Sequence, residues 1–251
     1  MQRKIGVVVP CANPAVEPEV HKLLPASYFP FISRLPYYSD LDMKQRLSNY
    51  VSDLPKSVAE LKGLNLDGIL VACTGSSYPL GISGDQEWMK SASEQLGKPV
   101  VSAAGSVHQV LQLLKAKELI IISPYPEWLT AELINFWRSA GFEINQVISL
   151  DKSGVIYDLS PADIATAIAQ AAAAIDPETQ NQVILIAGTG VPTLESIEVV
   201  IEEITVPIIT SQIAGIWNLL NQITTAKSNS TSPSVALTKL DSQIKAANAR
   251  G

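Results

Sequence analysis

Seven short runs of apolar, largely β-branched residues constrain the fold of this chain more than any other feature. They are apolar at nearly every position and lack the alternation of a strand with one face in water. A strand that is buried on both faces of a parallel sheet has this pattern. The runs that we predict to be strands cover residues 4–10, 68–73, 98–103, 118–124, 146–150, 182–188 and 206–211.

Segments with helical periodicity separate these runs. Strands that alternate with helices are typical of an α/β fold with parallel sheets. Ser160 followed by Pro161 is a typical helix start, with an N-cap residue and a proline in the first turn. The segments that we expect to be helical include residues 43–62, 86–96, 106–114, 126–140, 161–174 and 194–203.

The chain contains one internal repeat. Three landmarks recur in the same order at a nearly constant spacing: a proline after a strand, a turn that contains Thr-Gly, and a proline before a strand. Any two α/β units resemble each other to some degree, but shared order and spacing favour a true repeat. The matched pairs are Pro10 with Pro124, Cys73 with Gly188, and Pro99 with Pro207.

The repeat predicts two similar α/β halves. Residues 1–103, with part of the C-terminal region, form the first half and residues 104–225 the second, and helices can exchange between them. Residues 226–251 are expected to be a flexible tail because their first part is rich in serine and asparagine, although the part from Val235 has the pattern of a short helix. Ligands bind at the carboxyl ends of parallel strands, so we expect a site in the cleft between the halves.

Charge and composition narrow the classes of protein. A net charge of −6 with scattered basic residues argues against binding to nucleic acid or anionic membranes. No stretch approaches the roughly 18 apolar residues that a membrane-spanning helix needs. Two cysteines and two histidines argue against a disulfide scaffold or a structural zinc site. We therefore expect a cytoplasmic protein with reduced thiols and no metal.

Cys73 is the first candidate for chemistry. It follows a buried strand and precedes the turn Thr74-Gly75-Ser76, whose backbone N–H groups can bind an anion and lower the pKa of a thiol. The alternative is that Cys73 is a small buried hydrophobic residue, which is a common fate of an intracellular cysteine. Its position in the sequence leaves both interpretations open.

Three further sites near strand ends are candidates for ligand binding. Asn13 either hydrogen-bonds a ligand or caps a helix. Tyr125 either holds a carboxylate through its hydroxyl or packs as an aromatic residue with a wet tip. The turn Gly188-Thr189-Gly190 matches the Cys73 turn, and it either lets the backbone approach a ligand closely or simply connects a strand to a helix.

Three other residues with reactive side chains are not placed in the site. Cys11 has no partner in the repeat, so we interpret it as structural. His21 and His108 lie within helical patterns, away from the strand ends. The chain has no Ser-His-Asp order, HExxH motif or Walker motif, so a nucleotide or metal cofactor has little support.

Five motifs together resemble one enzyme group, the aspartate/glutamate racemase superfamily, in the branch that holds arylmalonate decarboxylase and maleate cis-trans isomerase. The motifs are VVPCANPAVEPE, LVACTG, SPY, GTGVPTLESI and VPIITSQIAGIWN, and the similarity spans residues 4–223. The resemblance implies two flavodoxin-like halves with parallel sheets, related by a pseudo-twofold axis, with the active site between them. It also implies carbanion chemistry without a cofactor.

The resemblance assigns roles to several residues. Members of the family use two facing cysteines; the first matches Cys73, whereas the second falls on Gly188. The family's active-site asparagine and tyrosine match Asn13 and Tyr125. The substrate carboxylate is implied to bind at the two turns, which comprise Thr74, Gly75, Ser76, Thr189 and Gly190.

The same resemblance places an apolar leaving-group pocket, known from the decarboxylase, near Tyr38, Leu41 and Val155. Arg46 replaces an aromatic residue of that pocket. A charge there favours a more polar or polyanionic substrate over an aryl one. The expected partner is thus a small carboxylate or dicarboxylate, while the choice between monomer and homodimer stays open.

The missing second cysteine limits the reaction. A racemase needs an acid and a base on opposite faces of one carbon, so racemisation is not expected from one thiol. A decarboxylase needs one proton donor, and our first expectation is a cofactor-independent decarboxylase of substituted malonates in which Cys73 protonates an enediolate. The alternatives are a maleate-like cis-trans isomerase with Cys73 as nucleophile, and a non-catalytic protein that binds dicarboxylates.

Overall fold

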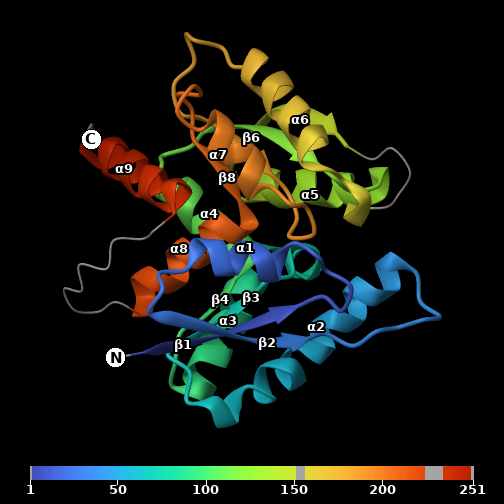
Figure 1. The fold of residues 1–251 in the computed structure, drawn as a ribbon. Coiled ribbons are helices and arrows are strands. Elements are labelled where there is room, and N and C mark those ends of the chain that lie inside the picture. Colours follow the sequence, from blue (N-terminus) through green and yellow to red (C-terminus); the bar gives the residue numbers. More distant parts are fainter. Residues whose placement is uncertain (1, 151–155, 224–233, 250–251) are drawn as a thin grey trace.

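Two four-stranded sheets form the framework of the chain, in a computed structural model that describes residues 2–150, 156–223 and 234–249. Both sheets are parallel throughout, and their strand orders are equivalent, β2-β1-β3-β4 and β6-β5-β7-β8. The predicted α/β fold with two parallel halves is confirmed (Figure 1). The strands are β1 (Arg3–Val9), β2 (Tyr28–Arg34), β3 (Gly68–Val71), β4 (Val100–Ser102), β5 (Glu118–Ser123), β6 (Glu143–Ser149), β7 (Gln182–Ile186) and β8 (Ile208–Thr210).

Helices cover both faces of each sheet. Among the described residues, no helix combines the length and the apolar character that crossing a membrane requires. The helices are α1 (Val16–Leu23), α2 (Met43–Ala59), α3 (Gly81–Leu96), α4 (Ala103–Leu113), α5 (Glu127–Ser139), α6 (Pro161–Ala173), α7 (Leu194–Val200), α8 (Ser211–Ile223) and α9 (Val235–Ala249).

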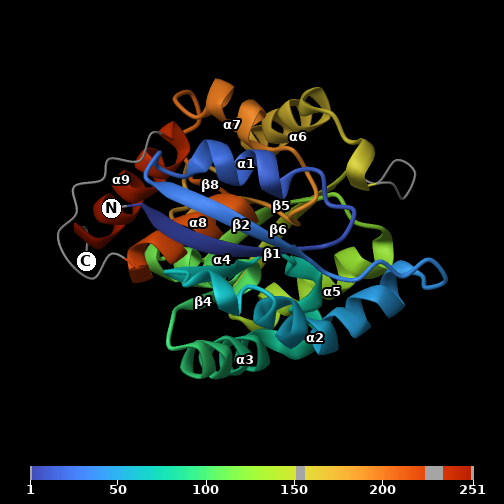
Figure 2. The same ribbon diagram turned by 60° about the horizontal axis from the view of Figure 1, so that its bottom comes forward.

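The continuous apolar runs are explained by two cores, one on each face of the first sheet. Along β1, Val7 and Val9 belong to one core, whereas Val8 belongs to the other. Successive side chains of a strand point to opposite faces, so both parities must be apolar when both faces are covered. Figure 2 shows α2 and α3 on one side of this sheet and α1 and α8 on the other.

The landmarks of the sequence repeat occupy equivalent places in the two halves. Pro10 and Pro124 directly follow the first strand of each half, and Pro99 and Pro207 directly precede the last. Cys73 and Gly188 each lie two residues beyond the third strand in chain order of their half. The halves therefore correspond element by element at the strand ends that form the cleft.

Strand β2 was not among the predicted strands. Its middle residues are only partly buried, and Pro30 interrupts the run, so it lacks the pattern of the central strands. The structure places β2 at an edge of the first sheet, where a proline is tolerated because one side of the strand has no ladder to complete. The first sheet consequently has one more strand than the apolar runs indicated.

Helix α8 joins the two halves. It follows β8 of the second sheet, yet it packs against β3 and β4 of the first. Two glycines allow this close approach: a Cβ on Gly68 would lie 2.8 Å from a methyl group of Leu219, and a Cβ on Gly215 would lie 2.8 Å from a methyl group of Leu70. One face of the first sheet is thus covered by a helix from the far end of the chain.

A flexible tail was expected over residues 226–251, with the pattern of a short helix from Val235. The helix is present, whereas residues 226–233 lie outside the described residues. Residues Val235–Ala249 form helix α9, which packs against α4, α7 and α8. Leu237, Leu240 and Ile244 are buried in this contact. Their spacing puts all three on one face of the helix, and burial of that face outweighs the polar composition of the segment.

We predict that Gly68→Leu lowers the free energy of unfolding by about 1–3 kcal/mol, because a side chain here must displace Leu219 and Ile223 in a filled core. Gly63→Leu is the matched control, since nothing lies within 4 Å of a Cβ at that position. Urea titration of both variants measures the effect. Equal stability of the two would show that α8 does not rest tightly on β3.

Candidate active site

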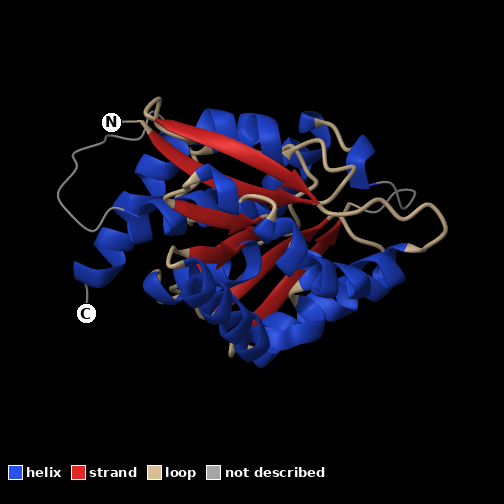
Figure 3. Ribbon diagram, turned by 90° about the horizontal axis from the view of Figure 1, so that it is seen from below, coloured by secondary structure: helices blue, strands red, loops and turns tan. Residues whose placement is uncertain are grey.

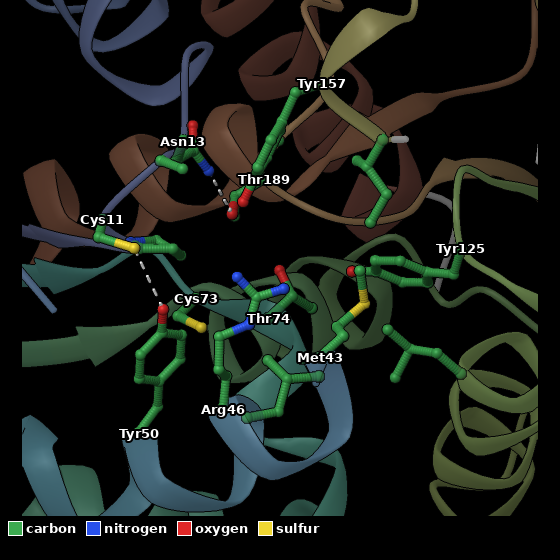
Figure 4. Close-up of a pocket in the computed structure, with 17 residues that line it drawn as sticks. Cys11, Asn13, Met43, Arg46, Tyr50, Cys73, Thr74, Tyr125, Tyr157 and Thr189 are labelled. Carbon is green, nitrogen blue, oxygen red and sulfur yellow. Dashed lines mark hydrogen bonds between the residues drawn. The ribbon is translucent and has the colours of Figure 1, made fainter. Parts of the chain in front are cut away.

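A cavity of about 320 Å³ lies where the carboxyl ends of the two sheets meet. In Figure 3 the strands of both sheets point toward one side of the molecule, where loops gather. The lining includes loop residues that follow β1, β3, β5 and β7, and one face of α2 closes it (Figure 4). The position is the one expected from the repeat, between the halves.

Cys73 lies in this cavity at the start of a tight turn formed by Thr74–Ser76. The Ser76 hydroxyl donates to the Cys73 carbonyl over 2.8 Å and holds the turn in place. Only 3% of Cys73 is exposed, and burial raises the pKa of its thiol, while hydrogen bonds from Ser76 oppose that rise in part. The protonated thiol is therefore favoured in the resting site.

Asn13 and Thr189 connect the two halves across the cavity. The Asn13 amide oxygen accepts from the N–H groups of Ala15 and Val16 at 3.0 Å and so supports the start of α1, although the N-cap position itself is Ala15. Its amide nitrogen donates to the Thr189 hydroxyl over 3.2 Å, and that hydroxyl donates to the Ala72 carbonyl over 3.1 Å. The Thr189 hydroxyl has thus given its one proton to the protein, which leaves backbone N–H groups as the anion donors of this turn.

Thr74 keeps a proton available for a ligand. Its hydroxyl lies 2.9 Å from that of Ser211, and either oxygen can be the donor. When Ser211 donates, the Thr74 proton is free to point into the cavity that Thr74, Gly75 and Gly190 line. The two turns can therefore hold a carboxylate between the halves.

Tyr125 occupies the space that a second thiol would need. Gly188 has a φ of +83°, which disfavours any residue with a side chain. A Cβ at this position would lie only 2.8 Å from the Tyr125 hydroxyl oxygen. Tyr125 is 6% exposed, and burial raises the pKa of its phenol. The second half accordingly presents a neutral phenol in place of a cysteine.

Arg46 brings a positive charge into the cavity from α2. Among the described lining residues it is the only one with a full charge, and no carboxylate of the described chain pairs with it. Its Nε is buried without a hydrogen-bond partner. Figure 4 shows the guanidinium group directed toward the middle of the cavity, near Thr74 and Met43. Arg46 as a whole is only partly buried, but its Nε has lost water without gaining a partner, so the cavity is suited to an anion.

Four of the residues expected in the site do not line the cavity. The Ser76 hydroxyl is used by the Cys73 carbonyl, and Gly188 lies behind Tyr125. Tyr38 donates to Asp53 over 2.5 Å and does not line the cavity, and Leu41 precedes α2 without reaching it. Val155 lies outside the described residues.

Several lining residues were not expected from the sequence. Cys11, interpreted as structural, lines the cavity, with its sulfur 3.6 Å from the Tyr50 hydroxyl oxygen. Tyr50 reaches the cavity from α2, and Tyr157 packs on Gly190. Cys11 directly follows Pro10 at a strand end, and this position was the one sequence signal that could have placed it in the site. No sequence signal identifies Tyr50 or Tyr157 as lining residues.

Glu19 forms a second polar connection between the halves, beside the cavity. It lies on α1, is 6% exposed, and its carboxylate accepts from the backbone N–H groups of Thr193 and Leu194 at the start of α7. The Thr193 hydroxyl also lies within 3.2 Å of it. Burial raises the pKa of Glu19 to about 7, against the opposing effect of these hydrogen bonds.

Two parallel α/β halves with the same strand order enclose a cavity that is lined by a thiol, a phenol and two glycine-containing turns. A family model described as arylmalonate decarboxylase matches residues 5–235. The chain therefore belongs to the arylmalonate decarboxylase family, and the resemblance found in the sequence is confirmed.

Known relatives include both an isomerase and a decarboxylase. The maleate isomerase of Pseudomonas putida strain KT2440 is 24% identical over 232 residues, which cover 88% of this chain and 91% of that protein. Unliganded arylmalonate decarboxylase has a TM-score of 0.73 and 20% identity, over 90% of this chain and 95% of that chain. A Nocardia farcinica maleate cis-trans isomerase mutant, solved with a covalently bound succinylcysteine intermediate, has a TM-score of 0.70 and 21% identity, over 89% and 93% of the two chains.

The family comprises carboxy-lyases and cis-trans isomerases, and the chain is an enzyme of this group. This agrees with the expectation that racemisation is not its reaction. The choice between the lyase and the isomerase rests on the details of the cavity.

We predict that Gly188→Ala is less stable than Gly141→Ala by about 1–3 kcal/mol. Both glycines have positive φ, so both substitutions share the backbone cost, but nothing lies within 4 Å of a Cβ at Gly141. Only the variant at 188 must displace Tyr125. Adding Tyr125→Phe should recover part of the loss in urea titrations; equal stability of the two alanine variants would contradict the assigned position of the Tyr125 hydroxyl.

A pH dependence of stability follows from Glu19. Because its folded-state pKa is raised from 4.5 to about 7, the folded protein holds more protons than the unfolded chain between these values. The free energy of unfolding should therefore fall by about 3 kcal/mol as pH rises from 4.5 to 7, relative to Glu19→Gln, which cannot ionise. Glu94→Gln, on the exposed face of α3, is the control and should follow the wild type. Parallel curves for wild type and Glu19→Gln would contradict the raised pKa.

Proposed function

We propose that the protein is a cis-trans isomerase of maleate-like dicarboxylates, with Cys73 as the nucleophile. The observation that carries the proposal is the guanidinium group of Arg46, which faces the cavity with its Nε buried and without a partner. One substrate carboxylate binds at the turns that contain Thr74 and Gly190, and the other pairs with Arg46. The identity of the maleate isomerase relatives is in line with this assignment.

Arg46 supports isomerisation over decarboxylation if it pairs with the carboxylate that decarboxylation would remove. Decarboxylation turns a charged carboxylate into neutral carbon dioxide. An arginine beside that carboxylate stabilises the ground state more than the transition state and so raises the barrier. Isomerisation retains both carboxylates, so the same ion pair persists through the transition state, where the developing carbanion charge spreads into a carboxylate that the site already holds. The charge thus favours isomerisation.

One thiol suffices for this reaction. The Cys73 thiol first loses its proton to solvent. The resulting thiolate forms a bond to one alkene carbon, and the π electron pair moves to the neighbouring carbon and into its carboxylate. The former double bond is now single and can rotate. When the carbon–sulfur bond breaks, its electron pair returns to Cys73 while the electron pair on the neighbouring carbon re-forms the double bond in the trans arrangement. The absence of a side chain at Gly188 does not block any of these steps.

Decarboxylation of substituted malonates is the second candidate. The observation in its favour is the burial of Cys73, which raises the pKa of its thiol, because such a thiol is a proton donor more readily than a nucleophile. Met43, Leu47, Leu129 and Ile156 also give the cavity apolar walls.

The test compares both reactions in the purified enzyme. We expect fumarate to form from maleate, as followed by proton NMR, with little carbon dioxide released from phenylmalonate. Cys73→Ala should reduce fumarate formation to background. Release of carbon dioxide from phenylmalonate without fumarate from maleate would select the decarboxylase, and tight binding of maleate without turnover would select a binding protein.

Arg46→Met should lower kcat/KM for maleate by about 10- to 100-fold, the value of one charge-assisted hydrogen bond. Lys56→Met is the matched control, because it removes a cation from an exposed position on the same helix, outside the cavity. Unchanged kcat/KM in the Arg46 variant would mean that the second carboxylate binds elsewhere.

A further inference from the structure

Two thiols, not one, line the cavity. Cys11 lies two residues beyond β1 and Cys73 two residues beyond β3, and these strands are neighbours in the first sheet, where Val8 pairs with Val71. In Figure 4 both sulfur atoms lie on the same side of the cavity, with Tyr50 beside them. The cavity therefore contains a second thiol, although this thiol comes from the first half and not from the position of Gly188.

Tyr50 holds the Cys11 sulfur in position. Its hydroxyl oxygen is 3.6 Å from that sulfur, and the tyrosine itself is only 4% exposed. Burial is the main cause of the raised pKa of Tyr50, and the hydrogen bond to Cys11 and the charges of Cys11 and Cys73 add to it. One phenol is thus influenced by both thiols, which places them in a common environment.

The proposed isomerisation can use a proton donor in addition to the nucleophile Cys73. Addition of Cys73 leaves a carbanion on the neighbouring carbon, and protonation of this carbon gives a succinyl thioether. The covalent intermediate of the Nocardia farcinica relative is such a succinylcysteine. In the present cavity the phenols of Tyr50 and Tyr125 have pKa values raised by burial and are weak acids. Cys11 is only partly buried and faces the same space.

We propose that Cys11 is the proton-transfer thiol of this site, a role that rests on the proposed function. Its S–H proton passes to the carbanion carbon and leaves a Cys11 thiolate. A one-third turn about the new single bond brings the original hydrogen of that carbon to Cys11 and moves the carboxylate to the trans position. The thiolate removes this hydrogen as the bond to Cys73 breaks, and Cys11 is again protonated.

This order of proton transfers predicts a specific deuterium content in the fumarate product. The hydrogen that Cys11 removes is the substrate's own, and it exchanges with solvent from the thiol before the next turnover. The hydrogen that Cys11 delivers therefore comes from solvent. Each fumarate formed in D₂O should therefore carry one deuterium on carbon. Isomerisation through an unprotonated carbanion would give fumarate without deuterium.

The experiment is conversion of maleate in D₂O, stopped early and analysed by mass spectrometry and proton NMR. Wild type should give singly deuterated fumarate. Cys11→Ala should form fumarate about 100-fold more slowly, the usual contribution of a general acid, and without deuterium. Cys11→Ser, which retains a polar contact to Tyr50, should resemble Cys11→Ala in its rate and deuterium content; urea titration of both variants shows whether either has lost stability.

The outcomes separate the two proposals. Undeuterated fumarate from wild type, or singly deuterated fumarate at the wild-type rate from Cys11→Ala, overturns the role of Cys11 and leaves the isomerase intact. Wild-type kinetics in Cys11→Ser would also overturn it, because a hydroxyl is a far weaker acid than a thiol. No fumarate from wild type overturns the isomerase and the role of Cys11 together.

Discussion

The cavity depends on buried polar contacts that cross from one half of the chain to the other. Glu19 on α1 accepts two backbone N–H groups at the start of α7, and the Thr189 hydroxyl is shared between Asn13 and the Ala72 carbonyl. Each of these groups would be costly to bury without its partner. The two strand-end surfaces are consequently fixed relative to each other, which sets the distance between the two turns that line the cavity.

Within this symmetric frame the side chains are distributed unequally. The first half supplies both thiols, Arg46 and Tyr50, whereas the second supplies Tyr125 and the backbone of a glycine-rich turn. The conformation of Gly188 and the proximity of Tyr125 reinforce this inequality, because together they leave no room for a thiol. A duplicated scaffold has thus become a site with its reactive groups on one wall and its anion donors on both.

The sequence was sufficient to predict the fold but not the full site. Buried parallel strands are apolar at every position, so the central strands were readily identified, whereas β2 lies at an edge and carries Pro30. Cys73 and Tyr125 were found because strand ends converge in such folds. Tyr50 was missed because helical periodicity does not show whether a buried helix face borders a core or a cavity. Cys11 was missed because it has no equivalent cysteine in the second half of the repeat and was therefore interpreted as structural.

The path of α8 has a consequence for how the chain acquires its structure. The helix that shields one face of the first sheet is made from residues that follow the last strand of the second. A nascent chain that ends near residue 103 would leave β3 and β4 uncovered on that face, with Gly68 and Leu70 open to water. The halves resemble two copies of one unit, yet the first is not a complete folding unit. Its sheet is covered only after the second half, which leads into α8, has been synthesised.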